Sequence, residues 1–480
     1  MSLPNELFLS CIFIYLHSTD LLRAFGQLRN ARLNALLYTY IRHIDLSTID
    51  ESSIERWLSS LLSLETNAIL SLRVTLDRFD SSFSFLFPRL NRLDLRLTTL
   101  SEQVSRICVL TQLTSFSITL TCGKAANIKG LAPFIWHSDR CLSSVSTSNC
   151  FILDKDDFCP TPSQSLMINQ NLTRLSLDLA HIRFVIVLMP FVPALEHLEV
   201  RLHRIYRDSS MLEEDFLQRW ESPAKVKSLR FLAFDQLVDT VCFCTLVKHF
   251  SLSLNYLSFY MSTPQRFLMC KWNSLEQYLL SDLPLLKQVE FCVHSGMRTL
   301  GGDHRRKFDH WTRNEVISIL HPTKAMTRFT MPFAFDHLEY VSNAFVDYHT
   351  NYNQSNVIRS FPSIVIITFY PSGRFNLGLF TFIQQTCLSL RQIRFKIDCC
   401  LSDDLIHNTD LTLPTVTKLC LSNVIPLIDS STLRRLLFLM PHLQFLTAQR
   451  DNIAYINKIK ESNASVLQHI IKITMVESNH

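Results

Sequence analysis

The feature that most constrains the fold of this chain is a repeated spacing of apolar residues. An apolar residue, two residues of any kind and then apolar residues at alternate positions recur along most of the sequence. Clear copies begin at Leu90, Leu172, Leu195 and Leu390. Weaker copies begin at Ile69, Leu113, Leu142, Leu229, Leu254, Leu286, Met326, Ile364, Val416 and Leu443. One such unit cannot bury both of its faces alone, so the repetition predicts a solenoid of stacked repeats.

The spacing between copies is that of leucine-rich repeats. Most copies start at or a little above the roughly 20–29 residues that are typical of such repeats. The alternation within a copy gives a short strand, and an apolar stretch such as 184–189 supplies a helix to cover it. We therefore predict an α/β fold with parallel strands on a concave face and helices on a convex face. Prolines stand just before several strands and end the preceding helices: Pro88, Pro193, Pro284 and Pro441.

The repeats lack one regular element of leucine-rich repeats. Their ninth position usually carries an Asn or Cys ladder. Here the ninth positions hold Thr98, Thr121, Ala180, His203 and Val424. The turns must therefore satisfy their backbone groups in another way. Apolar spacing of this kind also occurs in ordinary α/β units, and that interpretation stays open.

Composition favours a folded chain in a reducing compartment. The 480 residues are 47% hydrophobic, and the 14 cysteines are scattered without a paired framework. Lys+Arg (47) nearly balance Asp+Glu (42), and no run of like charge suggests a nucleic-acid partner. We find no secretory signal at the start, and the apolar stretch 184–195 is broken by prolines and too short to span a membrane. We expect a cytoplasmic or nuclear protein with no nucleic-acid or membrane partner.

Motifs for catalysis are not found in the sequence. The only Gly-Lys pair, at Gly123, is preceded by Ile118 where a phosphate loop needs glycine, and neither GxSxG nor HExxH occurs. Two Cys and His groups, around Cys242 and Cys399, lack the spacing of zinc ligands and are interpreted as buried structural residues. His294, His304 and His310 are assigned to an exposed loop in a long insertion around 294–325. We predict that the chain is not an enzyme and holds no cofactor or metal.

The amino-terminal segment is a candidate for three short helices. Residues 7–16 are apolar at nine of ten positions, which exceeds what a helix with one solvated face needs. A second helix can begin at residues 18–20, which are all good N-cap residues, and a third carries Leu33, Leu36 and Leu37. An apolar surplus of this kind predicts a surface for a partner.

The same segment resembles the start of an F-box over residues 2–45. The resemblance rests on Leu3, Pro4, Glu6, Leu7, Ile12, Phe13, Leu16, Asp20, Leu21 and Leu22. The later Val-Ser-Arg-x-Trp stretch of the family is replaced by residues 28–33, which contain no tryptophan. The resemblance implies an F-box domain at 1–45, a leucine-rich-repeat solenoid at 46–480, and binding of the ten residues to the Skp-type linker subunit of a cullin ubiquitin ligase.

F-box proteins with leucine-rich repeats are substrate receptors, so the resemblance implies an adaptor that binds the linker subunit through its F-box and a client protein through its repeats. The alternative is an interaction scaffold unconnected to ubiquitin, in which the amino-terminal helices only cap the solenoid.

Alternation within the strands also predicts a client site. Positions three, five and seven of each copy point away from the core. Near the carboxyl end these positions carry Arg394, Lys396 and Lys418, with Tyr370 and Phe445 on the flanking strands. Such a patch suits an acidic or phosphorylated segment. The simpler alternative is that these charges only solvate the sheet.

Overall fold

The structure is a computed structural model of residues 1–480. The residues it describes are 20–21, 24, 30–40, 43–46, 70–76, 89–97, 112–120, 126–127, 141–151, 168–179, 182, 185, 188–202, 224–238, 240–263, 282–295, 315–321, 326–346, 349–350, 360–370, 374–396, 400–421, 430–449, 456, 470 and 472–476. The chain divides into two compact units. The amino-terminal unit comprises residues 1–235, 241–256 and 283–286, and the carboxy-terminal unit comprises 236–240, 257–282 and 287–480.

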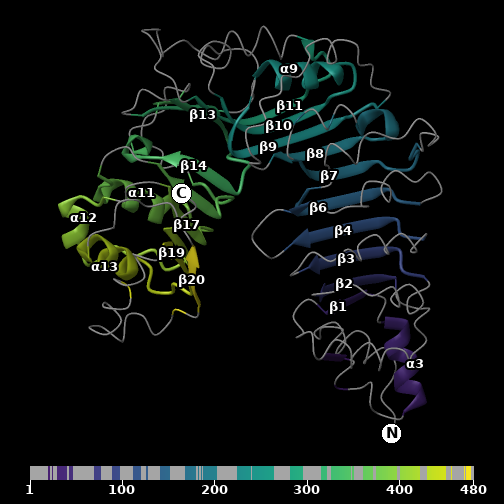
Figure 1. Ribbon diagram of the computed structural model, residues 1–480, viewed down its shortest axis with the longest axis horizontal. Coiled ribbons are helices and arrows are strands. Elements are labelled where there is room, and N and C mark those ends of the chain that lie inside the picture. The colour runs from purple at the N-terminus through teal and green to yellow at the C-terminus, as the bar shows by residue number, and fades with distance from the viewer. Residues whose placement is uncertain are drawn as a thin grey trace. The chain divides into compact units, whose positions relative to one another are not determined.

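The amino-terminal unit is a stack of parallel strands in chain order (Figure 1). These are β1 (His43–Leu46), β2 (Ser71–Leu76), β3 (Arg92–Leu97), β4 (Ser115–Leu120), β6 (Ser144–Phe151), β7 (Arg174–Leu179), β8 (His197–Leu202) and β9 (Ser228–Leu237), with the short β5 (Ala126–Asn127) beside β6. The described helices are α3 (Ala31–Tyr40), η6 (Met189–Phe191) and α9 (Thr240–His249). The predicted solenoid of stacked parallel strands is confirmed.

The core of this unit is built from ladders of inward residues in register. Leu46, Val74, Leu95 and Ile118 are cross-strand partners on consecutive strands, and none of them is exposed. Burial of each such side chain contributes about 1.5–3 kcal/mol to the free energy of folding. The alternation that the sequence shows is therefore the alternation of buried and outward positions along each strand.

A ladder of backbone carbonyls joins successive repeats where their strands begin. The carbonyl of Asn91 accepts hydrogen bonds from the N–H groups of Thr114 (2.8 Å) and Ser115 (3.0 Å), and the carbonyl of Thr114 accepts in the same way from the next repeat. The hydroxyls of Thr114, Ser143 and Thr173 each donate to the carbonyl of the preceding repeat. This arrangement satisfies backbone groups at the strand entry without a side-chain amide ladder.

The carboxy-terminal unit contains two kinds of sheet. In the first, β10 (Tyr256–Thr263) and β11 (Gln288–Ser295) are followed in spatial order by β13 (Met326–Met331), β12 (Glu315–Leu320) and β15 (His349–Thr350), and the pairs that involve β12 and β13 are antiparallel. In the second, parallel strands return in the order β14 (His337–Val341), β16 (Ile366–Phe369), β17 (Gln392–Phe395), β18 (Lys418–Leu421), β19 (Phe445–Gln449) and β20 (Lys472–Val476).

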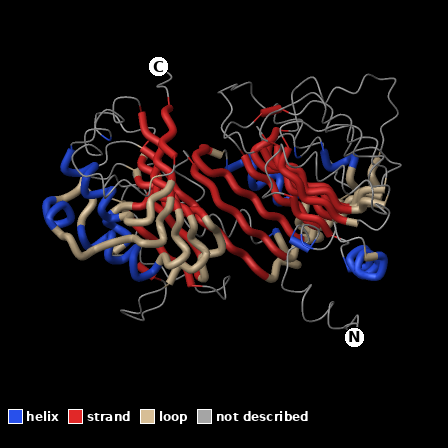
Figure 2. The backbone as a smooth tube through the Cα atoms, turned by 90° about the horizontal axis from the view of Figure 1, so that it is seen from below, coloured by secondary structure: helices blue, strands red, loops and turns tan. Residues whose placement is uncertain are grey.

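Helices connect the parallel strands of this second sheet. They are η8 (Asn343–Phe345), α11 (Leu377–Thr386), α12 (Asp403–His407) and α13 (Ser430–Leu439). Figures 1 and 2 show α11, α12 and α13 on one side of the strands. The Asn376 side chain caps α11 by accepting a hydrogen bond from the Leu379 N–H. The helix side is packed with aromatic residues, since the ring of Phe369 stacks on those of Phe380 and Phe395.

Two repeat positions predicted from the sequence are wrong. Met326 begins β13, which pairs antiparallel with β11 and β12 and is not a parallel repeat. The copy assigned to Leu229 begins three residues earlier, because Leu229 is the cross-strand partner of Leu198, the fourth residue of its own repeat. At Leu229 the Leu-rich stretch fits the apolar spacing in more than one register, whereas at Met326 the spacing is present and the strand direction differs.

The helix predicted at 184–189 agrees with the described residues there, since Val185 and Leu188 are helical and fully buried, and the short η6 at 189–191 follows directly. Three further strands, β1, β14 and β20, were not predicted from the apolar spacing, and each pairs in parallel with a neighbour.

Only part of the F-box-like segment lies among the described residues. α3 coincides with the third predicted helix, is capped by the Asn30 side chain, and buries Leu33, Leu36 and Leu37. Asp20 is helical and exposed, and Leu21 is helical and fully buried. The remaining residues of the resemblance lie outside the described residues: Leu3, Pro4, Glu6, Leu7, Ile12, Phe13, Leu16 and Leu22.

Candidate functional site: the strand face of the carboxy-terminal sheet

The outward face of the second sheet places an exposed aromatic ring between two lysines. The partner of Phe445 is Lys418 on β18 and Lys472 on β20, so the three side chains form one row across three strands. All three are exposed, and Phe445 keeps 39% of its surface accessible although it is a large apolar residue. Exposed aromatic rings with charged neighbours are typical of binding surfaces.

A second row adds another cation. Arg394 on β17 is half-buried, lies between Thr368 and Cys420, and is diagonal to Lys418, which pairs with Gln392. We call Arg394, Lys418, Phe445 and Lys472 the basic face. The outward positions described on β16 to β20 carry no acidic residue.

The structure brings most of the predicted client residues together. Arg394, Lys418 and Phe445 share one face, and Lys396 follows β17 directly, with its N–H bonded to the carbonyl of Phe369. Lys472 was missed, although Ile470, Ile473 and Met475 repeat the apolar spacing and could have revealed its strand. Their role in client binding stays a prediction.

Tyr370 has a different place from the one expected for an aromatic edge. Its ring stacks on Tyr340 at 4.1 Å between centroids, and Tyr340 in turn stacks on His294 at 3.3 Å. Tyr340 has a φ of 59° at the irregularity between β14 and β16, a conformation that is uncommon for a residue with a side chain. The hydroxyl of Ser262 donates to its phenol oxygen at 3.1 Å. Tyr370 therefore belongs to a stacked column that runs from two half-buried tyrosines to the buried His294.

Behind this column lies a chain of buried polar groups. His294 Nδ1 lies 3.0 Å from Thr327 Oγ1, which also lies 2.7 Å from His321 Nε2, and His321 Nδ1 lies 2.8 Å from Ser342 Oγ. Burial lowers the pKa of His321 to about 4, and burial together with the neighbouring His321 lowers the pKa of His294 to about 2. Both rings are therefore neutral at physiological pH. The assignment of His294 to an exposed loop is wrong, because it lies in β11 and is 7% exposed; His304 and His310 lie outside the described residues.

The same face becomes fully buried at β14. Glu339 has no exposed surface, and its Oε1 lies 3.9 Å from His337 Nε2, while that His337 nitrogen lies 2.7 Å from Thr368 Oγ1. Burial raises the pKa of the nearby Tyr260 and Cys292. The strand face therefore changes along the sheet, from a buried polar end at β14 to an exposed cationic end at β20.

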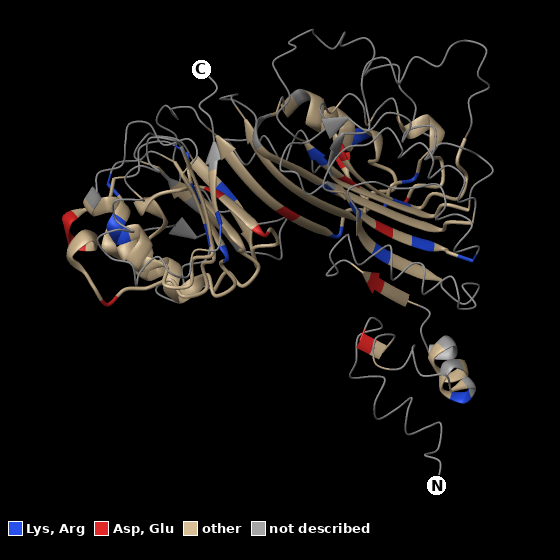
Figure 3. Cartoon of the chain, turned by 60° about the horizontal axis from the view of Figure 1, so that its bottom comes forward, with Lys and Arg blue, Asp and Glu red and all other residues tan. Residues whose placement is uncertain are grey.

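The strand face of the amino-terminal unit has a different charge pattern. Arg73 on β2 makes ion pairs with Asp94 on β3 (2.7 Å) and Asp45 on β1 (3.2 Å). These two carboxylates raise the pKa of Arg73, through the Asp94 hydrogen bond above all. Figure 3 shows both signs of charge on the strands of this unit.

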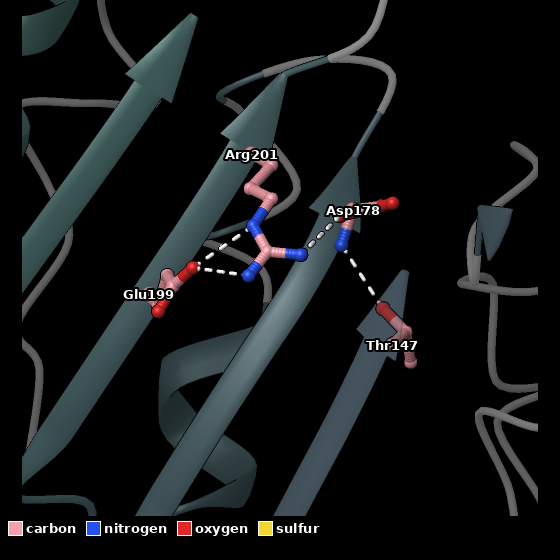
Figure 4. A network of polar contacts seen from close by, with 4 residues as sticks. All are labelled: Thr147, Asp178, Glu199 and Arg201. Atoms are coloured by element: carbon pink, nitrogen blue, oxygen red, sulfur yellow. Dashed lines mark hydrogen bonds and ion pairs between the residues drawn. The ribbon is translucent and has the colours of Figure 1, made fainter. Parts of the chain in front are cut away.

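A second network in the amino-terminal unit is drawn in Figure 4. Arg201 contacts Glu199 on its own strand at 2.6 Å and Asp178 on β7 at 4.0 Å. The N–H of Asp178 donates to the hydroxyl of Thr147, which stands in the buried ladder beside Ile118. In both networks the arginine therefore lies beside two carboxylates.

Other classes of site receive no support from the described residues. Within them, no group of three or more His, Cys, Asp or Glu side chains could hold a metal ion. None of the described helices is long and apolar enough to cross a membrane. Cys242, Cys244 and His249 lie along α9. No protein-family model matches the sequence, and no curated protein is significantly similar to it.

Proposed function

We propose that this protein is a substrate-recognition adaptor of a ubiquitin ligase, with an F-box-like segment at residues 1–45 that binds a Skp-type linker subunit and repeats that bind a client protein. The observation that carries the binding half is the basic face, with two exposed lysines, a half-buried arginine and one exposed aromatic ring on a parallel sheet. Sites held on strands are positioned more precisely than sites on loops. The resemblance of residues 2–45 to an F-box supports the other half.

The adaptor acts by proximity. A client on the repeats and a ligase on the amino-terminal segment belong to one chain, so binding raises the client concentration near the ligase. Catalysis then resides in other subunits. We expect this to occur in the cytoplasm or nucleus.

The second candidate is an interaction scaffold in which the amino-terminal helices only cap the solenoid. One observation favours it. α3 buries Leu33, Leu36 and Leu37 within the chain itself, as a cap would. The two candidates differ in whether residues 7–16 bind another protein.

The test is affinity purification of the full chain with Ile12→Asp and Leu16→Asp together. The adaptor predicts that the linker subunit is lost from the bound proteins, because each carboxylate would have to be buried at an apolar interface. The matched control is Leu252→Asp with Leu388→Asp, which makes the same change at positions that are 83% and 64% exposed. The scaffold would be favoured if both double variants recovered ligase subunits equally. It would also be favoured if the unchanged chain recovered no ligase subunit.

A further inference from the structure

The side chains of the basic face are regularly spaced, and this spacing favours a particular arrangement of anionic groups over anions in general. Lys418, Phe445 and Lys472 are direct partners on three consecutive strands. We infer that the basic face binds an extended acidic segment of the client, in which two carboxylates flank an apolar side chain that packs on Phe445. This inference rests on the proposed client-binding role and names the chemistry of the client.

The charge of the face selects an anionic partner. Arg394 and Lys418 lie on adjacent strands and Lys472 lies two strands beyond Lys418, and no ion pair to an acidic group is formed by the three among the described residues. The acid of this sheet nearest to the face, Glu339 on β14, is fully buried at its other end. An acidic segment would supply the carboxylates that the amino-terminal unit supplies to Arg73 and Arg201 from its own strands.

The kind of cation favours carboxylates spread along a peptide over a single phosphate. Phosphate groups are bound best by converging arginines or by free backbone N–H groups. The basic face instead offers lysines as separated point charges with one half-buried arginine. The backbone N–H groups of β18 and β19 already take part in parallel pairing. A single-stranded nucleic acid would need several stacking rings, whereas this face exposes one.

The distance between the lysines sets the spacing of the acids. Neighbouring strands lie about 4.8 Å apart, so the backbones at Lys418 and Lys472 are roughly 9.6 Å apart. In an extended peptide, which advances about 3.3 Å per residue, alternate side chains face the same side, so positions one, three and five face the sheet over about 13 Å. A segment that crosses the strands would therefore carry acids at its first and fifth positions and the apolar residue at its third, with the long lysine side chains reaching outward to the acids.

The experiment measures binding of labelled peptides to the purified full chain by fluorescence anisotropy. The probe has glutamates at the first and fifth positions and a leucine at the third, and the comparison peptides replace both glutamates by glutamine or the leucine by serine. We expect the acidic probe to bind, with affinity falling as salt rises. Lys418→Glu with Lys472→Glu should weaken it about tenfold or more, since each surface ion pair contributes a few-fold. Phe445→Ala should weaken the leucine probe and leave the serine peptide unchanged.

The matched control is Lys287→Glu with Arg434→Glu, which makes the same change of net charge at exposed positions outside this sheet face. It should leave binding unchanged, and Lys418→Arg with Lys472→Arg should retain it. Circular dichroism checks that every variant is folded. Equal loss in both charge-reversed variants would overturn the inference, as would tighter binding of a peptide whose only anion is phosphoserine, or of oligothymidylate. The peptide assay contains no linker subunit, so a failure to bind the acidic probe does not bear on the proposed ligase role. Conversely, loss of the linker subunit in the Ile12 and Leu16 variant does not bear on peptide binding.

Discussion

The two units are built from the same kind of strand, but the outward positions of their strands carry different patterns of charge. In the amino-terminal unit the outward arginines Arg73 and Arg201 lie beside acids of their own or neighbouring strands. In the carboxy-terminal unit the outward positions of β16 to β20 carry Arg394, Lys418 and Lys472 without acids. The inward ladders of both units are apolar and buried. The repeat pattern therefore determines the buried residues of each strand, whereas the outward residues differ between the units and can serve different functions.

The paired outward charges of the amino-terminal unit link its strands to one another, whereas the outward cations of the carboxy-terminal unit can contact a binding partner. A cation paired across a ladder has part of its field cancelled by its own chain, whereas cations on neighbouring strands add their fields. The exposed end of the carboxy-terminal sheet is thus the better place for an anionic partner. Its other end, at β14, is held by buried histidines that have no counterpart in the described amino-terminal unit.

The largest expected effect is a loss of stability of the carboxy-terminal unit on acidification. Above a pH of about 6.5 both histidines are neutral in the folded and unfolded chain. Below it the unfolded chain takes up protons that folded His321 and His294 resist, since their pKa values are lowered to about 4 and about 2. Stability is present above pH 6.5 and falls as the pH drops, by about 2 kcal/mol for each histidine at pH 5.

Hydrogen exchange between pH 7.5 and pH 5, corrected for intrinsic rates, measures this loss strand by strand. Protection in β12 and β13 should fall more than in β3 and β4. Replacing His321 by Gln should flatten the pH dependence, while His197→Gln on the outward face of β8 should not. Parallel loss of protection in both units at pH 5 would contradict the assignment to these two rings.

A smaller effect is expected in the amino-terminal unit from Thr147→Val. Thr147 is fully buried in an otherwise apolar ladder, and its hydroxyl accepts the Asp178 N–H at 3.0 Å. Valine keeps the shape but removes the acceptor, which should lower the free energy of unfolding by about 1–3 kcal/mol. Urea denaturation measures the change. Thr119→Val, at an outward half-buried position on β4, should change it by less than about 0.5 kcal/mol, and equal effects would show that the buried hydrogen bond is not the cause.

The smallest effect is expected for Arg73→Gln. This arginine links Asp45 and Asp94, but 41% of its side chain is exposed, so solvent screens both pairs. We expect a loss of under about 1 kcal/mol that disappears at high salt. Lys418→Gln, at a position without an acidic neighbour on its sheet face, should cost nothing or stabilise slightly. Thermal denaturation at two salt concentrations compares them, and a salt-independent loss for Arg73→Gln would mean that packing of its stem, and not charge, is what the strand requires.

The sequence by itself determined the repeating strand, because alternation with a period of two is a local property of the chain. The copies at Leu90, Leu172, Leu195 and Leu390 all precede strands in the expected register. The outward positions of Arg394, Lys418 and Phe445 follow from the same alternation. Where two apolar registers compete, as at Leu229, local pattern is not enough, since only pairing with Leu198 selects one.

Tertiary structure decided which strands are neighbours and what each neighbour covers. β13 has the apolar spacing of a repeat but pairs antiparallel, because direction depends on the path of the chain between strands and not on the strand itself. The burial of His294 follows from Tyr340 and Thr327, which are more than thirty residues away in sequence. Lys472 joins Phe445 only because β20 pairs with β19. Local alternation sets which way a side chain points, and long-range pairing sets which side chains it meets.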